Sequence, residues 1–379
     1  MKRLMIVAGE VSGDQHAARL VRDLRSVRGD VDVFGIGGEA LRREGVRTIV
    51  DAREMAVLGF FEVLARYPFF RRVFNQMTAL LSAEKPDALL LVDYPGFNLR
   101  LATKAHELGI PVLYYISPQV WAWHKSRIPK MAQILDLLMV IFPFEVDVFK
   151  GTGLKTVFVG HPLVESVKRT LANPSPELPW PDGQKRVALL PGSRRQEIQR
   201  ILPVMLDAAR EMRRRDPAVC FLIPAASAEM AELIEAQRAA LPDEERRTIG
   251  VVTGQMREVA RQARAAMVCS GTATMETALL RCPMIVVYRT ATLTYWLGRH
   301  LIQVKWLGMV NLVANRTLCS EFIQGDATPG AMVDALEPLV ADTPVRQAQL
   351  AGMEDVARAL EGEGLVRSAG QHVADALGG

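Results

Sequence analysis

The chain has 379 residues, of which 49% are hydrophobic and 23% are charged, a composition typical of a folded globular protein with two or three domains. Its 46 Lys and Arg residues against 42 Asp and Glu residues give a formal net charge of +4. This composition excludes an intrinsically disordered chain. The small excess of positive charge permits an anionic ligand but does not indicate a nucleic-acid-binding protein.

The first apolar run, Leu4–Ala8, predicts a buried strand. Glu10 and Asp14 follow at once, so the run does not fit a secretory signal peptide. No apolar stretch reaches the roughly 18 residues that suggest a membrane-spanning helix. The four cysteines stand apart, without a C-x-x-C pair or a histidine cluster. We therefore expect no disulfide framework, no metal site and a reducing, cytoplasmic environment.

The first 160 residues alternate short apolar runs with longer helical segments such as Asp14–Arg28 and Asn98–Leu108. Near-continuous apolar runs separated by helices are typical of a parallel sheet that is covered on both faces. The predicted strands are Leu4–Ala8, Val31–Ile36, Ala88–Val92, Pro111–Ile116 and Leu137–Ile141.

Residues 161–185 contain five prolines and no sustained period, which indicates a linker. The alternation of strands and helices resumes at residue 186 and continues to about residue 340. We therefore predict an α/β protein with two doubly wound, Rossmann-like domains, 1–160 and 186–340. Residues 341–379 are expected to form closing helices that could pack back on the N-terminal domain.

The segment Ala8–Asp14 (AGEVSGD) follows the first predicted strand. Gly9 and Gly13 allow a sharp turn, and Ser12 and Asp14 are favoured at helix N-caps. The segment is either a ligand-facing loop at the carboxyl end of the strand or a plain connection to a helix. The residues leave both open.

Asp93 follows the predicted strand Ala88–Val92, so we expect it at the carboxyl edge of the sheet, where open α/β sheets bind ligands. A carboxylate at that edge can act as a general base toward an alcohol. The alternative is that Asp93 caps the helix that begins near Asn98, a role that Asn98 itself could fill.

The segment Pro191–Glu197 (PGSRRQE) also follows a predicted strand. Gly192 and Ser193 would expose backbone amides at a helix start, and Arg194 can make a two-pronged contact to a phosphate. We favour phosphate binding here over a solvated pair of arginines.

The segment Cys269–Thr277 (CSGTATMET) is a second loop of small residues that enters a helix, and it suits a pyrophosphate. Glu276 lies about one turn into that helix, where its carboxylate can accept hydrogen bonds from ribose hydroxyls. The alternative is a tightly packed helix cap. The loop residues expected to bind are Ser270, Gly271, Thr272 and Ala273.

Aromatic and basic residues alternate in Leu58–Phe74. They would form either an apolar surface with a cationic rim for lipid chains and anionic head groups, or a helix that packs between domains. The candidate lipid-binding residues are Phe60, Phe61, Phe69, Phe70, Arg71 and Arg72.

The segment Gly35–Ala40 formally matches a dinucleotide-binding fingerprint, but it follows the second strand rather than the first. We therefore expect no nicotinamide cofactor, and nothing else in the sequence indicates a cofactor.

Together these segments resemble the bacterial lipid-A-disaccharide synthase family over nearly the full length. The resemblance is carried by nine motifs in the same order: AGEVSGD, MAVLGFFEVL, DYPGFN, YISPQVWAW, FVGHPL, LLPGSRRQEI, SGTATMET, CPMIVVYR and VNLVAN.

The resemblance implies an inverting glycosyltransferase of the B type, with two Rossmann-like domains that face each other across a cleft. Such enzymes join UDP-2,3-diacylglucosamine to 2,3-diacylglucosamine 1-phosphate (lipid X), without a cofactor, at the cytoplasmic face of the inner membrane. By the resemblance, the N-terminal domain binds the lipid acceptor and the C-terminal domain binds the UDP-sugar.

The resemblance also assigns residues. Asp93 would be the base, Arg194 a phosphate ligand, and Asn311 a cleft residue near the reacting sugars, while Glu10 and Ser12 would lie in the first loop. An oligomer is possible.

Two positions depart from the family pattern: Gly96 stands where a second acid is frequent, and Gln119 where serine is familiar. The alternative function is a UDP-sugar epimerase or hydrolase of the same fold.

Overall fold

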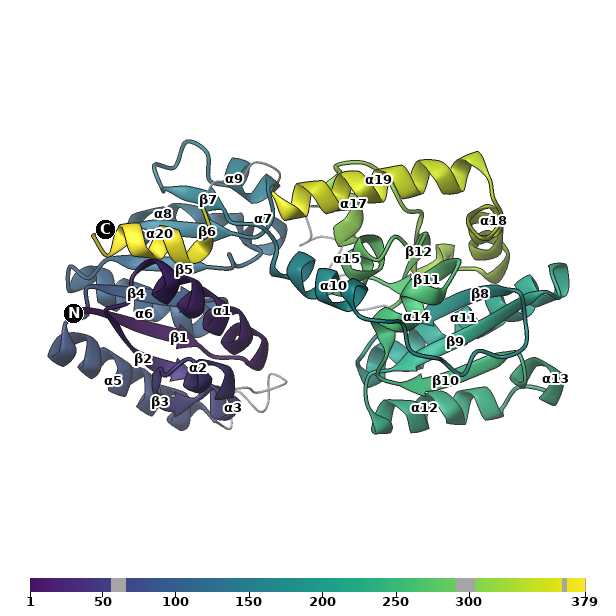
Figure 1. Ribbon diagram of the computed structural model, residues 1–379, viewed down its shortest axis with the longest axis horizontal. Coiled ribbons are helices and arrows are strands. Elements are labelled where there is room, and N and C mark those ends of the chain that lie inside the picture. The colour runs from purple at the N-terminus through teal and green to yellow at the C-terminus, as the bar shows by residue number, and fades with distance from the viewer. Residues whose placement is uncertain (56–65, 291–303, 363–366, 379) are drawn as a thin grey trace. The chain divides into compact units, whose positions relative to one another are not determined.

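The computed structural model describes residues 1–55, 66–290, 304–362 and 367–378 (Figure 1). The chain divides into two compact units. Unit 1 comprises Met1–Pro162 together with Gly362–Gly379, and unit 2 comprises Leu163–Glu361. The chain therefore crosses between the units twice.

Unit 1 contains a seven-stranded parallel sheet in the order β3-β2-β1-β4-β5-β6-β7. Its central strands form because their residues are apolar throughout: Leu4 to Ala8 and Ala88 to Val92 are fully buried. The strands are β1 (Lys2–Ala8), β2 (Val31–Gly37), β3 (Arg47–Asp51), β4 (Ala88–Val92), β5 (Val112–Tyr115), β6 (Leu137–Val140) and β7 (Thr156–Phe158).

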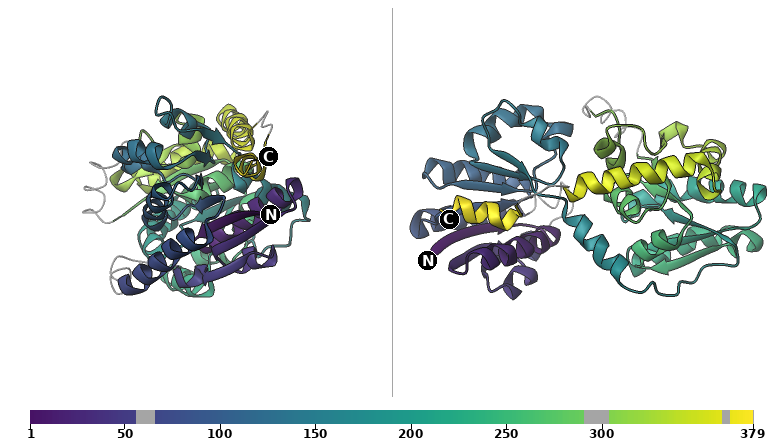
Figure 2. Two further views of the ribbon diagram at one scale, coloured as in Figure 1. Left: turned by 90° about the vertical axis from the view of Figure 1, so that its left-hand side faces the viewer. Right: turned by 45° about the horizontal axis from the view of Figure 1, so that its top comes forward.

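Helices cover both faces of this sheet. On one face, α5 (Tyr67–Glu84), α6 (Pro95–Glu107) and α8 (Ile128–Ile134) share a core with alternate strand residues such as Met5 and Leu89. On the other face, α1 (Val11–Val27) packs beside α20 (Ala369–Ala376), as Figure 2 shows. The remaining helices of unit 1 are the short α2 (Glu39–Arg43), α3 (Ala52–Met55), α7 (Val120–Trp123) and α9 (Phe144–Val148).

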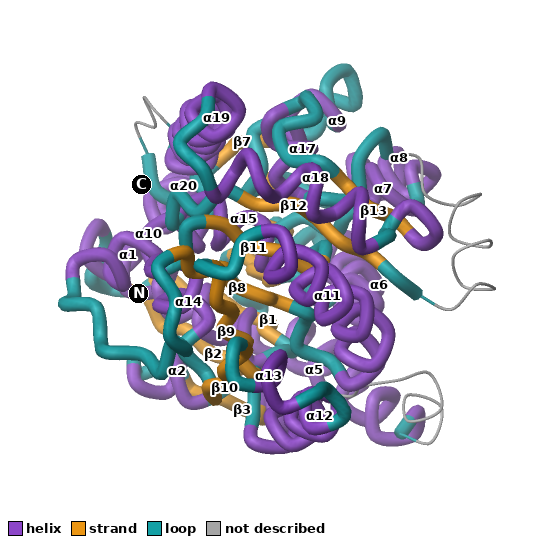
Figure 3. Tube along the Cα trace, turned by 90° about the vertical axis from the view of Figure 1, so that its right-hand side faces the viewer, coloured by secondary structure: helices purple, strands orange, loops and turns teal. Residues whose placement is uncertain are grey.

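Unit 2 contains a six-stranded parallel sheet in the order β10-β9-β8-β11-β12-β13. Figure 3 shows its strands with α11 on one side and α14 on the other. The strands are β8 (Lys185–Leu190), β9 (Val219–Ala225), β10 (Ile249–Thr253), β11 (Ala265–Cys269), β12 (Met284–Tyr288) and β13 (Glu321–Ile323).

The helices of unit 2 likewise form two layers. The helices α11, α12 and α18 share a core cluster with the sheet, while α14, α15, α17 and α19 pack outside that cluster. Their bounds are α10 (Pro162–Ala172), α11 (Arg195–Arg215), α12 (Ala228–Ala239), α13 (Asp243–Arg246), α14 (Met256–Gln262), α15 (Thr272–Leu279), α17 (Met309–Ala314), α18 (Pro329–Val340) and α19 (Pro344–Glu361).

The strand order reverses beside the first strand of each sheet, between β1 and β4 in unit 1 and between β8 and β11 in unit 2. Loops that leave the carboxyl ends of such neighbouring strands diverge to opposite faces and leave a crevice, which is where doubly wound sheets bind ligands. The predicted fold of two doubly wound domains is confirmed.

The segment predicted as a linker, residues 161–185, differs from that expectation because it begins with α10. Pro162 is the first residue of this helix, where the missing amide hydrogen costs nothing, and the other four prolines lie beyond its end. Arg257 and Arg261 of α14 donate hydrogen bonds to α10, which hold it on unit 2.

The C-terminal helices divide between the units. In unit 2, α19 packs on α15 and α17, whereas α20 returns to unit 1. A Cβ atom at Gly370 of α20 would lie 2.6 Å from the backbone nitrogen of Leu24, so only glycine permits this close approach to α1.

No helix in the described ranges combines the length and the apolar character needed to cross a bilayer.

Candidate functional site

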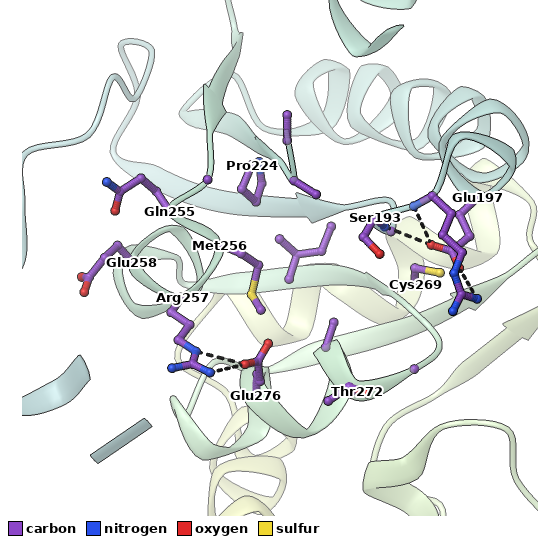
Figure 4. Close-up of a pocket in the computed structure, with 18 of the residues that line it drawn as sticks. Ser193, Glu197, Pro224, Gln255, Met256, Arg257, Glu258, Cys269, Thr272 and Glu276 are labelled. Atoms are coloured by element: carbon purple, nitrogen blue, oxygen red, sulfur yellow. Dashed lines mark hydrogen bonds and ion pairs between the residues drawn. The ribbon is translucent and has the colours of Figure 1, made fainter. Parts of the chain in front are cut away.

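Unit 2 contains a pocket of about 770 Å³ at the crevice beside β8 and β11 (Figure 4). It is formed by the loops that follow β8, β9, β10 and β11 and by the first turns of α14 and α15. All the residues predicted to bind a nucleotide line it: Gly192, Ser193, Arg194, Ser270, Gly271, Thr272, Ala273 and Glu276.

The loop after β11 presents unpaired backbone donors to this pocket. Gly271 precedes α15 with a φ of 145°, a conformation that favours glycine. The amides of Gly271, Thr272 and Ala273 donate to no acceptor among the described residues. Since the start of a helix carries partial positive charge, these amides suit an anion.

Ser270 is held in place by the protein. Its amide donates to the carbonyl oxygen of Val287 over 3.0 Å, and its hydroxyl donates to that of Leu307 over 2.9 Å. The hydroxyl oxygen of Ser270 can therefore accept a hydrogen bond from a ligand but has no free proton to give.

The loop after β8 differs from the prediction because a carboxylate of the protein already occupies its amides. Glu197 accepts from the amides of Ser193 over 2.9 Å and of Arg194 over 3.1 Å. A Cβ at Gly192 would lie 2.4 Å from the same carboxylate. The expectation that Ser193 exposes a free backbone amide is therefore wrong, since Glu197 closes the first turn of α11 in a capping box, while phosphate binding by this loop stays a prediction.

Arg194 remains available for an anion. Its side chain is 79% exposed, lies 3.5 Å from the Glu197 carboxylate and lines the pocket. Sequence reasoning missed Glu197, although a glutamate three residues after an N-cap position is the signal that would have found it.

Glu276 is held by a residue that the sequence analysis did not single out. Arg257 of α14 donates to one carboxylate oxygen of Glu276 over 3.0 Å and 2.6 Å, and Figure 4 shows the two side chains facing each other. Both residues line the pocket. No sequence spacing marks this pair.

In unit 1, Asp93 lies directly after β4, as predicted, and α6 begins at Pro95 rather than near Asn98. Asp93 and Tyr94 both adopt left-handed backbone conformations, with φ of 47° and 49°. The carbonyl oxygen of Asp93 accepts from the hydroxyl of Tyr114 over 2.5 Å and from the side-chain amide of Asn98 over 2.7 Å. These two buried donors hold the turn that carries the Asp93 carboxylate.

The surroundings of Asp93 favour the protonated, neutral form of its carboxyl more than is usual for an aspartate. Burial, followed by the negative charge of Glu10, raises the pKa of Asp93 to about 6. Glu10 precedes α1 after β1, and β1 pairs with β4, so the two carboxylates come from adjacent strand ends. A carboxylate with a pKa near neutrality is suited to taking up a proton.

The predicted roles of Ser12 and Asp14 change, because α1 begins at Val11 with Glu10 at its N-cap. Ser12 is exposed in the first turn of the helix. The Asp14 carboxylate accepts from the amides of Gly38, Ala40 and Leu41, so it caps α2 rather than α1.

Asn311 is buried and does not contact the pocket. Its side-chain nitrogen donates to the carbonyl oxygen of Cys319 and to Glu321, and its side-chain oxygen accepts from the amides of Leu318 and Cys319, each over 2.8 Å. Every hydrogen-bonding position of this side chain is therefore used within the protein. The structure therefore gives Asn311 a part in holding the segment 318–321, and its place near the reacting sugars stays a prediction.

Two of the predicted lipid-binding residues, Phe60 and Phe61, lie outside the described residues. Phe69 and Phe70 are half-buried against the core of unit 1, with their rings 5.6 Å apart. Arg71 and Arg72 are exposed on α5. The described part of the chain holds no cluster of three metal-ligating side chains, and its four cysteines are buried thiols.

Comparison with known proteins gives a consistent result. A family model described as lipid-A-disaccharide synthetase matches residues 4–374. The lipid-A-disaccharide synthase of Anaeromyxobacter sp. (strain K) is 38% identical over 364 residues, which cover 94% of this chain and 93% of the relative. Lipid-A-disaccharide synthase 1 of Legionella pneumophila is 41% identical over 327 residues, which cover 86% and 84%.

Solved structures share the fold at low sequence identity. A putative UDP-N-acetylglucosamine 2-epimerase from Listeria monocytogenes superposes with a TM-score of 0.62 at 14% identity and covers 99% of this chain and 95% of its own. The calicheamicin glycosyltransferase CalG4 superposes with a TM-score of 0.59 at 13% identity, covering 100% and 98%. These likenesses show a glycosyltransferase-B-type fold and nothing finer.

Proposed function

The chain belongs to the lipid-A-disaccharide synthase family and is a glycosyltransferase, and from this we propose its reaction in detail. It transfers the sugar of UDP-2,3-diacylglucosamine to 2,3-diacylglucosamine 1-phosphate (lipid X). The products are UDP and a β(1→6)-linked disaccharide 1-phosphate, and the anomeric carbon of the donor is inverted.

The observation that carries this proposal is the pocket of unit 2. It combines three unpaired amides at the start of α15, the exposed guanidinium of Arg194 and the carboxylate of Glu276. Amides and a guanidinium match a diphosphate, and a carboxylate matches the hydroxyls of a ribose. The pocket therefore has the donor and acceptor groups that UDP requires.

In the proposed reaction, Asp93 takes the proton of the acceptor 6-hydroxyl while that oxygen bonds to the anomeric carbon of the donor. The bond from that carbon to the phosphate oxygen breaks, and its electron pair leaves with UDP. The amides of Gly271–Ala273 and Arg194 stabilise the charge that develops on UDP, so no metal ion is needed.

Glu10 supplies the second acid that the family pattern often has in the Asp93 segment and that Gly96 replaces here. Its charge raises the pKa of Asp93, which is the effect that a neighbouring acid would have. Since a base is most effective with a pKa near the working pH, this pairing strengthens Asp93 as a proton acceptor.

The reaction is tested by incubating the chain with UDP-2,3-diacylglucosamine and lipid X and identifying the disaccharide 1-phosphate by mass spectrometry. Asp93→Asn is expected to lower turnover by about 10²–10⁴-fold, the typical loss of a general base, while UDP affinity stays near normal. Rapid UDP release without lipid X would instead favour an epimerase or hydrolase. Full turnover by Asp93→Asn would remove Asp93 from the mechanism.

The pH dependence of turnover tests the pairing of Asp93 with Glu10. The base acts only when ionised, so kcat is expected to fall as the pH drops below about 6 and to level off above it. Glu10→Gln removes a negative charge that opposes ionisation, so the midpoint should move to lower pH. The exposed Glu107→Gln should leave the midpoint unchanged, and an unchanged midpoint in Glu10→Gln would contradict the pairing.

Arg194 is tested by titrating UDP into the protein in a calorimeter. Arg194→Ala should weaken UDP binding about tenfold or more, because it loses a charge-assisted contact to phosphate. Arg195→Ala is the matched control, since its side chain pairs with Glu229 and does not line the pocket. Equal affinities for the two variants would exclude Arg194 as a phosphate ligand.

We further propose that the chain works at the cytoplasmic face of the inner membrane, where a lipid acceptor is found. Two observations support a contact through α5: Arg71 and Arg72 are exposed, and Phe69 and Phe70 lie beside them half-buried. Basic side chains next to aromatic rings suit an interface with anionic lipid head groups.

This contact is tested by co-sedimentation with vesicles that contain anionic phospholipid. The double variant Arg71→Glu/Arg72→Glu should sediment several-fold less, because each reversed charge is repelled by the lipid surface. The double variant Arg100→Glu/Lys104→Glu makes the same charge change on exposed positions of α6 and should sediment normally. Equal sedimentation of both variants would place the membrane contact elsewhere.

A further inference from the structure

Arg257 lines the pocket and also contacts α10, whose Thr170 belongs to the same lining. Its Nε donates to Glu276 Oε1 over 3.0 Å and its Nη2 donates to the same oxygen over 2.6 Å. Both side chains are largely buried, with 28% of Arg257 and 15% of Glu276 exposed. The pair is therefore screened by solvent much less than a surface ion pair.

The other side of the guanidinium is also fixed. Its Nη1 donates to the hydroxyl of Ser166 over 2.7 Å, to the carbonyl oxygen of Ser166 over 3.3 Å and to the hydroxyl of Thr170 over 3.4 Å. Because a guanidinium is planar, contacts on both edges fix its orientation, and with it the place of the carboxylate that it binds.

The carboxylate keeps one oxygen free for a ligand. Both bonds from Arg257 end on Oε1, and no described residue donates a hydrogen bond to Oε2. Glu276 lines the pocket with the amides of Thr272 and Ala273, one turn away on the same helix. A ligand whose diphosphate lies at those amides would bring its sugar hydroxyls next to Oε2.

We infer that Arg257 is a positioning residue that makes the pocket select a ribonucleotide over a 2′-deoxyribonucleotide. It holds the Glu276 carboxylate so that Oε2 accepts a hydrogen bond from a ribose hydroxyl. It also balances the negative charge of Glu276, which would otherwise oppose binding of a diphosphate nearby. This inference rests on the proposed binding of UDP in the pocket.

The inference is tested by measuring the affinities of UDP and of 2′-deoxy-UDP by calorimetry. The unmodified protein is expected to bind UDP about tenfold or more tightly than 2′-deoxy-UDP, because a hydrogen bond to a charged group is lost with the hydroxyl. Glu276→Ala should reduce this ratio to about one. Arg257→Met should reduce it nearly as far, and the double variant no further, because both changes remove the same contact.

Arg261→Met is the matched control. Arg261 lies one turn along α14 and donates to the carbonyl oxygen of Thr170 in α10 and to that of Asn173, just beyond the helix. No hydrogen bond or ion pair joins it to Glu276. It should keep the tenfold ratio even if the melting temperature falls. A merely structural role of Arg257 would weaken both ligands equally and leave the ratio intact.

Two outcomes would overturn the inference but not the proposed function. One is an unchanged ratio of UDP to 2′-deoxy-UDP affinity in Arg257→Met. The other is an unmodified protein that binds UDP and 2′-deoxy-UDP equally well. Failure of the unmodified protein to bind UDP at all would overturn the proposed function and this inference with it.

Discussion

The backbone amides at the start of α15 need an acceptor that the described part of the protein does not supply. Helix starts always leave amides unpaired, and the two loops at the crevice of unit 2 meet this constraint differently. After β8, the Glu197 carboxylate takes the amides of Ser193 and Arg194. After β11, the amides of Gly271, Thr272 and Ala273 stay open. The described residues thus satisfy one helix start and leave the other open, and the exposed Arg194 lines the same pocket as the open one.

In unit 1, the turn that carries the Asp93 carboxylate has an unfavourable backbone conformation. Left-handed conformations of non-glycine residues cost of order 1–3 kcal/mol each, and Asp93 and Tyr94 are consecutive. The hydroxyl of Tyr114 and the amide of Asn98 offset this cost by bonding the Asp93 carbonyl. Asp93 directly follows the last residue of β4, and there burial, followed by the negative charge of Glu10, raises the pKa of its carboxyl to about 6.

The sequence predicted what depends on local pattern. The run Ala88–Val92 coincides with β4 because an apolar run ends where the strand leaves the core. The same reasoning correctly placed Asp93 and the pocket-lining loops at the carboxyl ends of the strands. What it could not predict are long side chains whose partners are distant along the chain. Arg257 donates hydrogen bonds to Glu276 and Ser166. The side-chain amide of Asn311 forms all its hydrogen bonds with the segment 318–321. A motif shows that such a residue matters but not what it contacts.

Arg257 connects the pocket to α10, the helix at the first place where the chain crosses between the units. The first crossing leads into α10, whose Ser166 and Thr170 bind Arg257, and the second leaves from the end of α19. Lys168 of α10 forms an ion pair with Glu361, the last residue of α19, so both crossings leave unit 2 side by side. Beyond the second crossing, α20 packs against α1 of unit 1. Unit 1, which carries Asp93, therefore includes a helix that the chain reaches only after it has passed through unit 2.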